Sequence, residues 1–126
     1  MPAREQRPVI VLVDEEPSIR QAIVRLLQEA SFEVVEAADS DKARRLLEQT
    51  PAIHALVIDA HVPGKIDGFE LAALARKRWP DLAVVMMSGH SDATSGPVPP
   101  GGEFVAKPYL PTHLVPALKR LLGRDS

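Results

Sequence analysis

Residues 9–30 read VIVLVDEEPSIRQAIVRLLQEA, and this stretch indicates how the chain folds. Its first five residues, Val9–Val13, form a continuous apolar run rich in β-branched side chains, which is typical of a strand buried on both faces of a parallel sheet. From Ser18 to Ala30 the apolar residues recur at helical spacing, and Pro17 stands where the first turn of a helix tolerates proline. The stretch therefore predicts one strand followed by one helix.

The alternation of strand and helix continues along the chain. The apolar patterns predict further strands at Glu33–Ala37, Ala55–Ile58, Ala83–Met87 and Glu103–Ala106. They predict further helices from about Ser40 to Gln49, behind a cap at Asp39 or Ser40, and at Pro111–Leu122. Another helix is predicted to open at Asp67 or Gly68 and to run to about Arg78. Right-handed crossovers between such units make the strands parallel and place helices on both faces of the sheet. We therefore expect an α/β fold, a doubly wound five-stranded parallel sheet with the flavodoxin-like order 2-1-3-4-5.

The alternation fails between the fourth and fifth predicted strands. Residues 91–102 contain three prolines and three glycines, a composition that disfavours any helix longer than one turn. We expect the fourth helix of this fold to be short or absent, and the segment Ser91–Gly102 to be mobile or irregularly packed.

The composition is that of one small domain. The 126 residues suit a single core, which we place at 9–122 between tails at 1–8 and 123–126. The 15 basic and 17 acidic residues nearly cancel and are interspersed, so we expect no direct nucleic-acid binding. The apolar run at Val9–Val13 is too short for a signal peptide or a membrane span, and there is no cysteine for disulfides or thiolate metal sites. We expect a soluble, cytoplasmic protein without membrane contact.

Acidic side chains follow two of the predicted strands. Asp14, Glu15 and Glu16 come after the first strand, and Asp59 comes after the third. In the expected strand order, the carboxyl ends of these two strands meet at the crevice where ligands bind. Clustered carboxylates need a compensating cation, and oxygen ligands with open positions suit hydrated Mg²⁺. The sequence therefore predicts a magnesium site.

A simpler explanation is that each acidic residue only stabilises the start of a helix or a turn. For any one residue alone this is the better explanation. However, Ser88 follows the fourth predicted strand and Lys107 follows the fifth, at the same end of the sheet. Because such an assembly would require several independent coincidences, we favour a functional site.

Four segments resemble the receiver domains of response regulators in two-component signalling, and among them the small stand-alone receivers. They are VLVDEEPSIR at 11–20, IDAHVPGKIDGFEL at 58–71, VVMMSGH at 84–90 and FVAKPY at 104–109. The resemblance extends from Val9 to Leu122 and rests on the four motifs in combination.

The resemblance implies that Asp59 is a phosphoacceptor, which takes a phosphoryl group from a histidine kinase, a histidine phosphotransfer protein or a small phosphodonor. It implies that Mg²⁺ is bound by Asp14, Glu15, Asp59 and the main-chain carbonyl of His61, and that Lys107 completes the charge balance. Self-phosphorylation and self-dephosphorylation are the only reactions that it implies, so the chain is not expected to be an enzyme. The phosphorylated domain would signal by contact with a downstream protein that the sequence does not identify.

The resemblance also implies a conformational switch. Ser88 would hydrogen-bond a phosphoryl oxygen while the ring of Phe104 turns inward, and a cis peptide before Pro108 would aim Lys107 into the site. Three ordinary explanations stay open: a serine in a turn, a phenylalanine in the core, and a trans peptide, which most X-Pro bonds adopt.

Two histidines stand two residues after the acceptor and two after the switch serine. The resemblance implies that His61 and His90 tune the lifetime of the phosphorylated form. Ordinary exposed loop histidines are an equal alternative, and a transition-metal site made with Asp59 is a remote one.

The chain departs from the family pattern in three places. Glu15 occupies a position that is most often aspartate, and Pro63–Gly68 is one residue longer than the commonest spacing. The missing fourth helix would alter the face that most receivers use for output and dimerisation, so we expect a monomer or a weak dimer.

Two other functions remain open. The first is a receiver-like interaction module that does not need phosphorylation, which Glu15 and the eroded fourth helix suggest. The second is a flavin-binding or enzymatic flavodoxin-like domain, which ranks low because the turn after Val13 lacks the Gly, Ser or Thr run that would cradle a phosphate.

Overall fold

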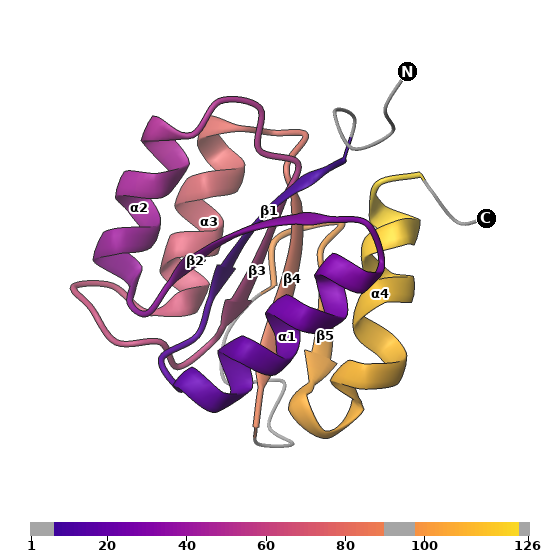
Figure 1. The fold of residues 1–126 in the computed structure, drawn as a ribbon. Coiled ribbons are helices and arrows are strands. Elements are labelled where there is room, and N and C mark those ends of the chain that lie inside the picture. Colours follow the sequence, from indigo (N-terminus) through magenta and orange to yellow (C-terminus); the bar gives the residue numbers. More distant parts are fainter. Residues whose placement is uncertain (1–6, 90–97, 124–126) are drawn as a thin grey trace.

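The computed structural model describes residues 7–89 and 98–123, which build a parallel sheet between two layers of helices (Figure 1). The strands are β1 (Val9–Val13), β2 (Glu33–Ala37), β3 (Ala55–Asp59), β4 (Ala83–Ser88) and β5 (Glu103–Ala106). The helices are α1 (Pro17–Glu29), α2 (Ser40–Gln49), α3 (Gly68–Arg78) and α4 (Leu110–Leu121), with a short 3-10 helix, η2, at Lys107–Tyr109. The strand order is β2-β1-β3-β4-β5 and every pair is parallel, which confirms the predicted fold class and topology.

The sheet separates two apolar cores. Along β1, alternate side chains face opposite sides: Val11 and Val13 belong to the core under α2 and α3, whereas Ile10 and Leu12 belong to the core under α1 and α4. All four are fully buried, as the continuous apolar run predicts for a strand covered on both faces. Figure 1 shows the two helix pairs on opposite sides of the sheet.

Two helices begin where the sequence places capping residues. The Asp39 carboxylate accepts a hydrogen bond from the Lys42 N–H at 2.7 Å and starts α2. Asp67 and Glu70 form a reciprocal capping box at the start of α3, with distances of 2.8 and 3.1 Å. The predicted starts of both helices are therefore confirmed.

The described helices are shorter than a helix that spans a membrane. The longest of the described helices, α1, has 13 residues, whereas a spanning helix needs about 20 apolar ones. Within residues 7–89 and 98–123, no helix is long and apolar enough to cross a bilayer.

The connection between β4 and β5 contains no helix among its described residues. Residues 90–97, which include His90 and much of the proline- and glycine-rich segment, lie outside the described part of the chain. After this segment, Val98 packs against the core under α2 and α3. Arg76 of α3 donates hydrogen bonds to the carbonyl oxygens of Leu82 and Pro100. This part of the segment is packed irregularly against α3, as expected, and the expected mobility stays a prediction.

Gly68, the first residue of α3, touches the end of β3. Its N–H donates to the Ala60 carbonyl at 3.1 Å. A Cβ atom on Gly68 would lie 2.3 Å from the Asp59 carbonyl oxygen and 2.8 Å from the Ala60 Cα. Both are main-chain atoms that cannot rotate away, so only glycine lets α3 start this close to the last residue of β3.

Replacing Gly68 with alanine should lower the free energy of unfolding by about 1–3 kcal/mol, because the added methyl group forces α3 away from β3. Urea denaturation followed by circular dichroism measures the change. Gly89→Ala is the matched control, since the nearest atom to a Cβ there is the Lys107 Cδ at 3.8 Å. Equal stability of the two variants would contradict this account of the start of α3.

Candidate functional site

The carboxyl ends of four neighbouring strands carry the polar residues that the sequence singles out. Asp14 follows β1, Asp59 ends β3, Ser88 ends β4 and Lys107 follows β5. The pairing register keeps these ends level, so the four residues lie at the same edge of the sheet. This is the edge at which open α/β sheets bind their ligands.

Lys107 joins the two aspartates, and we call these three residues the Asp–Lys cluster. The Lys107 Nζ lies 2.9 Å from Asp14 Oδ2 and 2.8 Å from Asp59 Oδ2. The exposed fraction of the side chain is 1% for Asp14, 12% for Asp59 and 15% for Lys107. Charges removed from water to this degree need a partner, and here two carboxylates share a single ammonium group.

The lysine reaches the aspartates by passing over the end of β4, which lies between β5 and β3 in the sheet. Gly89 is the first residue after β4, and a Cβ atom on it would lie 3.8 Å from the Lys107 Cδ. The aliphatic part of Lys107 therefore runs directly beside this glycine. A small residue at the end of β4 leaves room for the lysine side chain.

The surroundings of Lys107 act on its pKa in opposite directions. Burial disfavours the ammonium form and by itself lowers the pKa, whereas the hydrogen bonds and charges of Asp59 and Asp14 stabilise that form. The two aspartates together outweigh burial, so the pKa of Lys107 lies above its ordinary value of 10.5. Lys107 is therefore a permanent positive charge at neutral pH.

The other oxygen of each aspartate is held by the main chain of its own loop. Asp14 Oδ1 accepts a hydrogen bond from the Glu16 N–H, and Asp59 Oδ1 accepts one from the His61 N–H, both at 2.9 Å. These bonds orient the carboxylates so that each Oδ2 faces Lys107. Asp14 Oδ2 is buried and makes no well-aligned hydrogen bond, so the ion pair with Lys107 is its contact.

The two aspartates fit a divalent cation, and the third expected carboxylate does not join them in this arrangement. Carboxylate oxygens are the ligands that Mg²⁺ prefers, and Asp14 Oδ2 is a buried oxygen with spare capacity to bind one. Glu15 is exposed. Across the described residues, no three His, Cys, Asp or Glu side chains come close enough to share a metal ion.

Arg20 also contributes to this edge of the sheet, although the sequence patterns do not single it out. From α1, its guanidinium donates to the Asp14 carbonyl at 2.8 Å and pairs with Glu36 of β2 at 3.0 Å. It thereby ties the loop that carries the acidic residues to both α1 and β2. The sequence signal for this role is weak, because a single arginine on an amphipathic helix usually faces solvent.

The two residues of the expected switch lie on the neighbouring strands β4 and β5. Ser88 is 1% exposed at the end of β4, and Phe104 of β5 is half-buried against the core under α2 and α3. His61 is exposed on the loop after Asp59. His90 lies outside the described residues, so its proximity to the site stays a prediction.

The prediction of a cis peptide bond before Pro108 is wrong. No peptide bond between the described residues is cis, and Pro108 lies within η2. The trans form is the lower-energy form of an X-Pro bond. Lys107 reaches both aspartates from the end of β5 with this trans bond, because its long side chain spans the width of β4.

Comparison with known proteins identifies one family. The family model described as response regulator receiver domain matches residues 10–119. Among curated relatives, the hydrogenase transcriptional regulatory protein HoxA of Cupriavidus necator is 28% identical over 120 residues, which cover 92% of this chain and 24% of HoxA. The chain thus spans about a quarter of the length of such relatives.

Solved structures match over almost their full length. A response regulator receiver protein from Sinorhizobium medicae is 27% identical, with a TM-score of 0.85 over 97% of this chain and 99% of that one. The response regulator protein TrrA from Thermotoga maritima, solved in complex with Mg²⁺-BeF, is 27% identical, with a TM-score of 0.81 over 91% of this chain and 99% of that one.

Replacing Lys107 with methionine should lower the free energy of unfolding, because both aspartates lose their counter-charge. The folded-state pKa of Lys107 is raised, so its contribution to stability is complete below about pH 10.4 and is lost as the pH rises through the folded pKa. The stability difference between wild type and Lys107→Met should stay constant from about pH 7 to about pH 9 and shrink above about pH 10.4.

Chemical denaturation at each pH measures this difference, with Lys119→Met of α4 as the control. A difference that stayed constant through the alkaline range, or a control that behaved like Lys107→Met, would show that the ion pairs do not contribute as described.

Proposed function

Because the chain belongs to the response regulator receiver domains, we propose that Asp59 accepts a phosphoryl group from a histidine kinase or a histidine phosphotransfer protein. The phosphorylated chain then signals by contact with another protein, and the cytoplasm is its expected location. The observation that carries the proposal is the Asp–Lys cluster, in which a carboxylate at the end of β3 lies 2.8 Å from a lysine ammonium.

The reaction requires a carboxylate oxygen of Asp59 to attack the phosphorus of a phosphohistidine. A bond forms between this oxygen and phosphorus, and the bond between phosphorus and the histidine nitrogen breaks, with its electron pair leaving on the imidazole. Phosphoryl transfer depends mainly on positioning and on neutralising negative charge. The His61 N–H holds Asp59 in place, and Lys107 supplies a positive charge beside the acceptor.

Mg²⁺ would be held by Asp14 and Asp59, with Glu15 and the main-chain carbonyl of His61 completing the set that the sequence suggests. When bound, the cation would neutralise the carboxylates and the phosphoryl oxygens together. Two observations support this part of the proposal: the buried Asp14 Oδ2 lacks a well-aligned hydrogen bond, and the similar TrrA was solved with Mg²⁺-BeF.

The same proposal gives the switch roles to Ser88 and Phe104 and the lifetime roles to His61 and His90. Ser88 lies at the end of β4 opposite Ala106, the residue before Lys107, which suits contact with a phosphoryl group on Asp59. The module that needs no phosphorylation is less well supported, because an acceptor, a second acidic residue and a lysine lie together.

Treatment with acetyl phosphate and Mg²⁺ should add the mass of one phosphoryl group to the wild-type chain and none to Asp59→Asn. Intact-mass spectrometry under mild conditions measures the adduct. Asp39→Asn, the same substitution at the start of α2, is the matched control and should still be labelled. A label that persists in Asp59→Asn would remove the assignment of the acceptor.

Titration with Mg²⁺ should shift the amide resonances of residues around Asp14 and Asp59, and Asp14→Asn should weaken this binding by about tenfold or more, because it removes a ligand charge. Amide NMR provides the measurement. Glu16→Gln is the matched control, since Glu16 lies in the same loop but outside the proposed ligand set. Equal losses in the two variants would argue against Asp14 as a ligand.

A further inference from the structure

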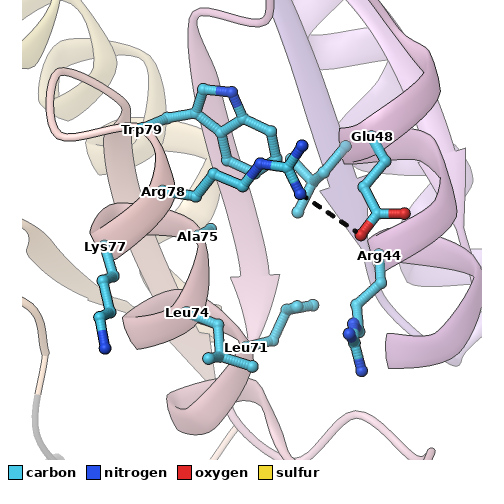
Figure 2. A pocket seen from close by; sticks show the side chains of 9 residues that line it. Arg44, Glu48, Leu71, Leu74, Ala75, Lys77, Arg78 and Trp79 are labelled. Carbon is cyan, nitrogen blue, oxygen red and sulfur yellow. Dashed lines mark ion pairs between the residues drawn. The ribbon is translucent and has the colours of Figure 1, made fainter.

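A groove separates α2 and α3 on the outer surface of their layer, and we call it the α2–α3 groove (Figure 2). Its volume is about 360 Å³, within the range of protein ligand pockets. Arg44, Leu47 and Glu48 line it from α2, and Leu71, Leu74 and Trp79 are among the residues that line it from α3 and the position after it. None of its lining residues belongs to the Asp–Lys cluster.

The α3 side of the groove is an apolar stripe. Leu71, Leu74 and Ala75 are spaced by three and four residues, which places them on one face of the helix. Leu71 and Ala75 are buried, but Leu74 is 48% exposed. Across the described residues, Leu74 and Tyr109 are the exposed large hydrophobic side chains, so the stripe presents at Leu74 an apolar surface that no described residue covers.

Trp79 closes one end of the groove beneath an arginine. The Arg78 guanidinium carbon lies 5.0 Å from the centre of the indole ring, and Arg78 Nη1 lies 3.7 Å from Glu48 Oε2 across the groove. The two paired side chains are 63% and 50% exposed, so this ion pair is weak. Arg78 can therefore pair with a carboxylate of a bound partner instead of Glu48.

Positive charge surrounds the apolar surface. Arg44, Lys77 and Arg78 line the groove, against the single acidic residue Glu48, although the whole chain has a formal net charge of −2. Figure 2 shows Arg44 and Lys77 on opposite sides, with the leucines between them. A second copy of the chain would bring these like charges together, which disfavours self-association through this surface.

We propose that the α2–α3 groove binds an acidic amphipathic helix of a partner protein. The apolar stripe of such a helix contacts Leu74 and Trp79, and its flanking carboxylates pair with Arg44, Lys77 and Arg78, as in other helix-in-groove complexes. The groove and the Asp–Lys cluster share no residue, so these contacts can form without a phosphoryl group on Asp59.

The test uses two synthetic helical peptides of about 14 residues, or four turns, held helical by a hydrocarbon staple. Both carry leucines at helical spacing; one has glutamates at the flanking positions and the other has lysines. Trp79 is the single tryptophan of the chain, so its fluorescence reports on the groove alone. We expect the acidic peptide to change Trp79 emission and to bind at least about tenfold tighter than the basic one, with weaker binding at higher salt.

Two variants locate the binding, and both are measured without phosphodonor. Arg44→Glu should lower the affinity for the acidic peptide by about tenfold, because it turns an attraction between opposite charges into a repulsion between like charges. Arg45→Glu is the matched control, because Arg45 is its exposed neighbour on α2 but does not line the groove, and it should change affinity by less than about twofold. Leu74→Ala should weaken binding by about fivefold through lost apolar contact.

Each variant is also treated with acetyl phosphate, and its phosphorylation is measured. A variant that loses peptide binding but is still phosphorylated on Asp59 shows that the two properties are separate. Equal binding of the two peptides, or equal effects of Arg44→Glu and Arg45→Glu, would overturn the proposal. So would peptide-induced amide NMR shifts that are confined to residues away from α2, α3 and Trp79. Sedimentation showing a dimer that Arg44→Glu alters would also overturn it and assign the groove to a second copy of the chain.

Discussion

The contact of Lys107 with Asp14 and Asp59 depends on the order of the strands and constrains every loop around it. The two aspartates stand at the ends of β1 and β3, where the sheet and its helices exclude most water. Burying two carboxylates side by side is strongly unfavourable unless a cation lies between them. The order β1-β3-β4-β5 brings the end of β5 near enough for a lysine to span β4 and supply that charge.

The loops of the site follow from the same constraint. Main-chain N–H groups of Glu16 and His61 hold the outer carboxylate oxygens, so that the inner oxygens face the lysine. Gly68 lets α3 start in contact with the end of β3. Because the carboxylates are bonded to their own loops, a change in charge at Asp59 acts directly on the backbone that carries it. The Asp–Lys cluster therefore links charge to loop position, whereas the α2–α3 groove offers an apolar and positively charged surface that shares no residue with it.

Sequence periodicity predicted the fold closely, because each strand and helix has a local pattern that needs no knowledge of its neighbours. The apolar run Val9–Val13 and the capping residues Asp39 and Asp67 mark their elements directly. Topology then brought Asp14, Asp59 and Lys107 to one edge. The prediction was wrong for the peptide before Pro108, since the general preference of X-Pro bonds prevailed over the family pattern. It also did not foresee that Arg76 holds the end of the segment leading to β5.

The sequence by itself determined the fold class, the strand order and the set of residues at the carboxyl edge, because alternation of apolar runs and the handedness of crossovers leave few other arrangements. Only the tertiary structure decided which groups touch. In the folded chain the two aspartates share the ammonium group of Lys107, and Glu15 is exposed. Arg20 donates a hydrogen bond to the loop after β1. The tertiary structure also brought α2 and α3 together to make a groove that neither helix contains alone. These contacts join residues far apart in the chain, and their distances depend on packing, which local sequence patterns do not encode.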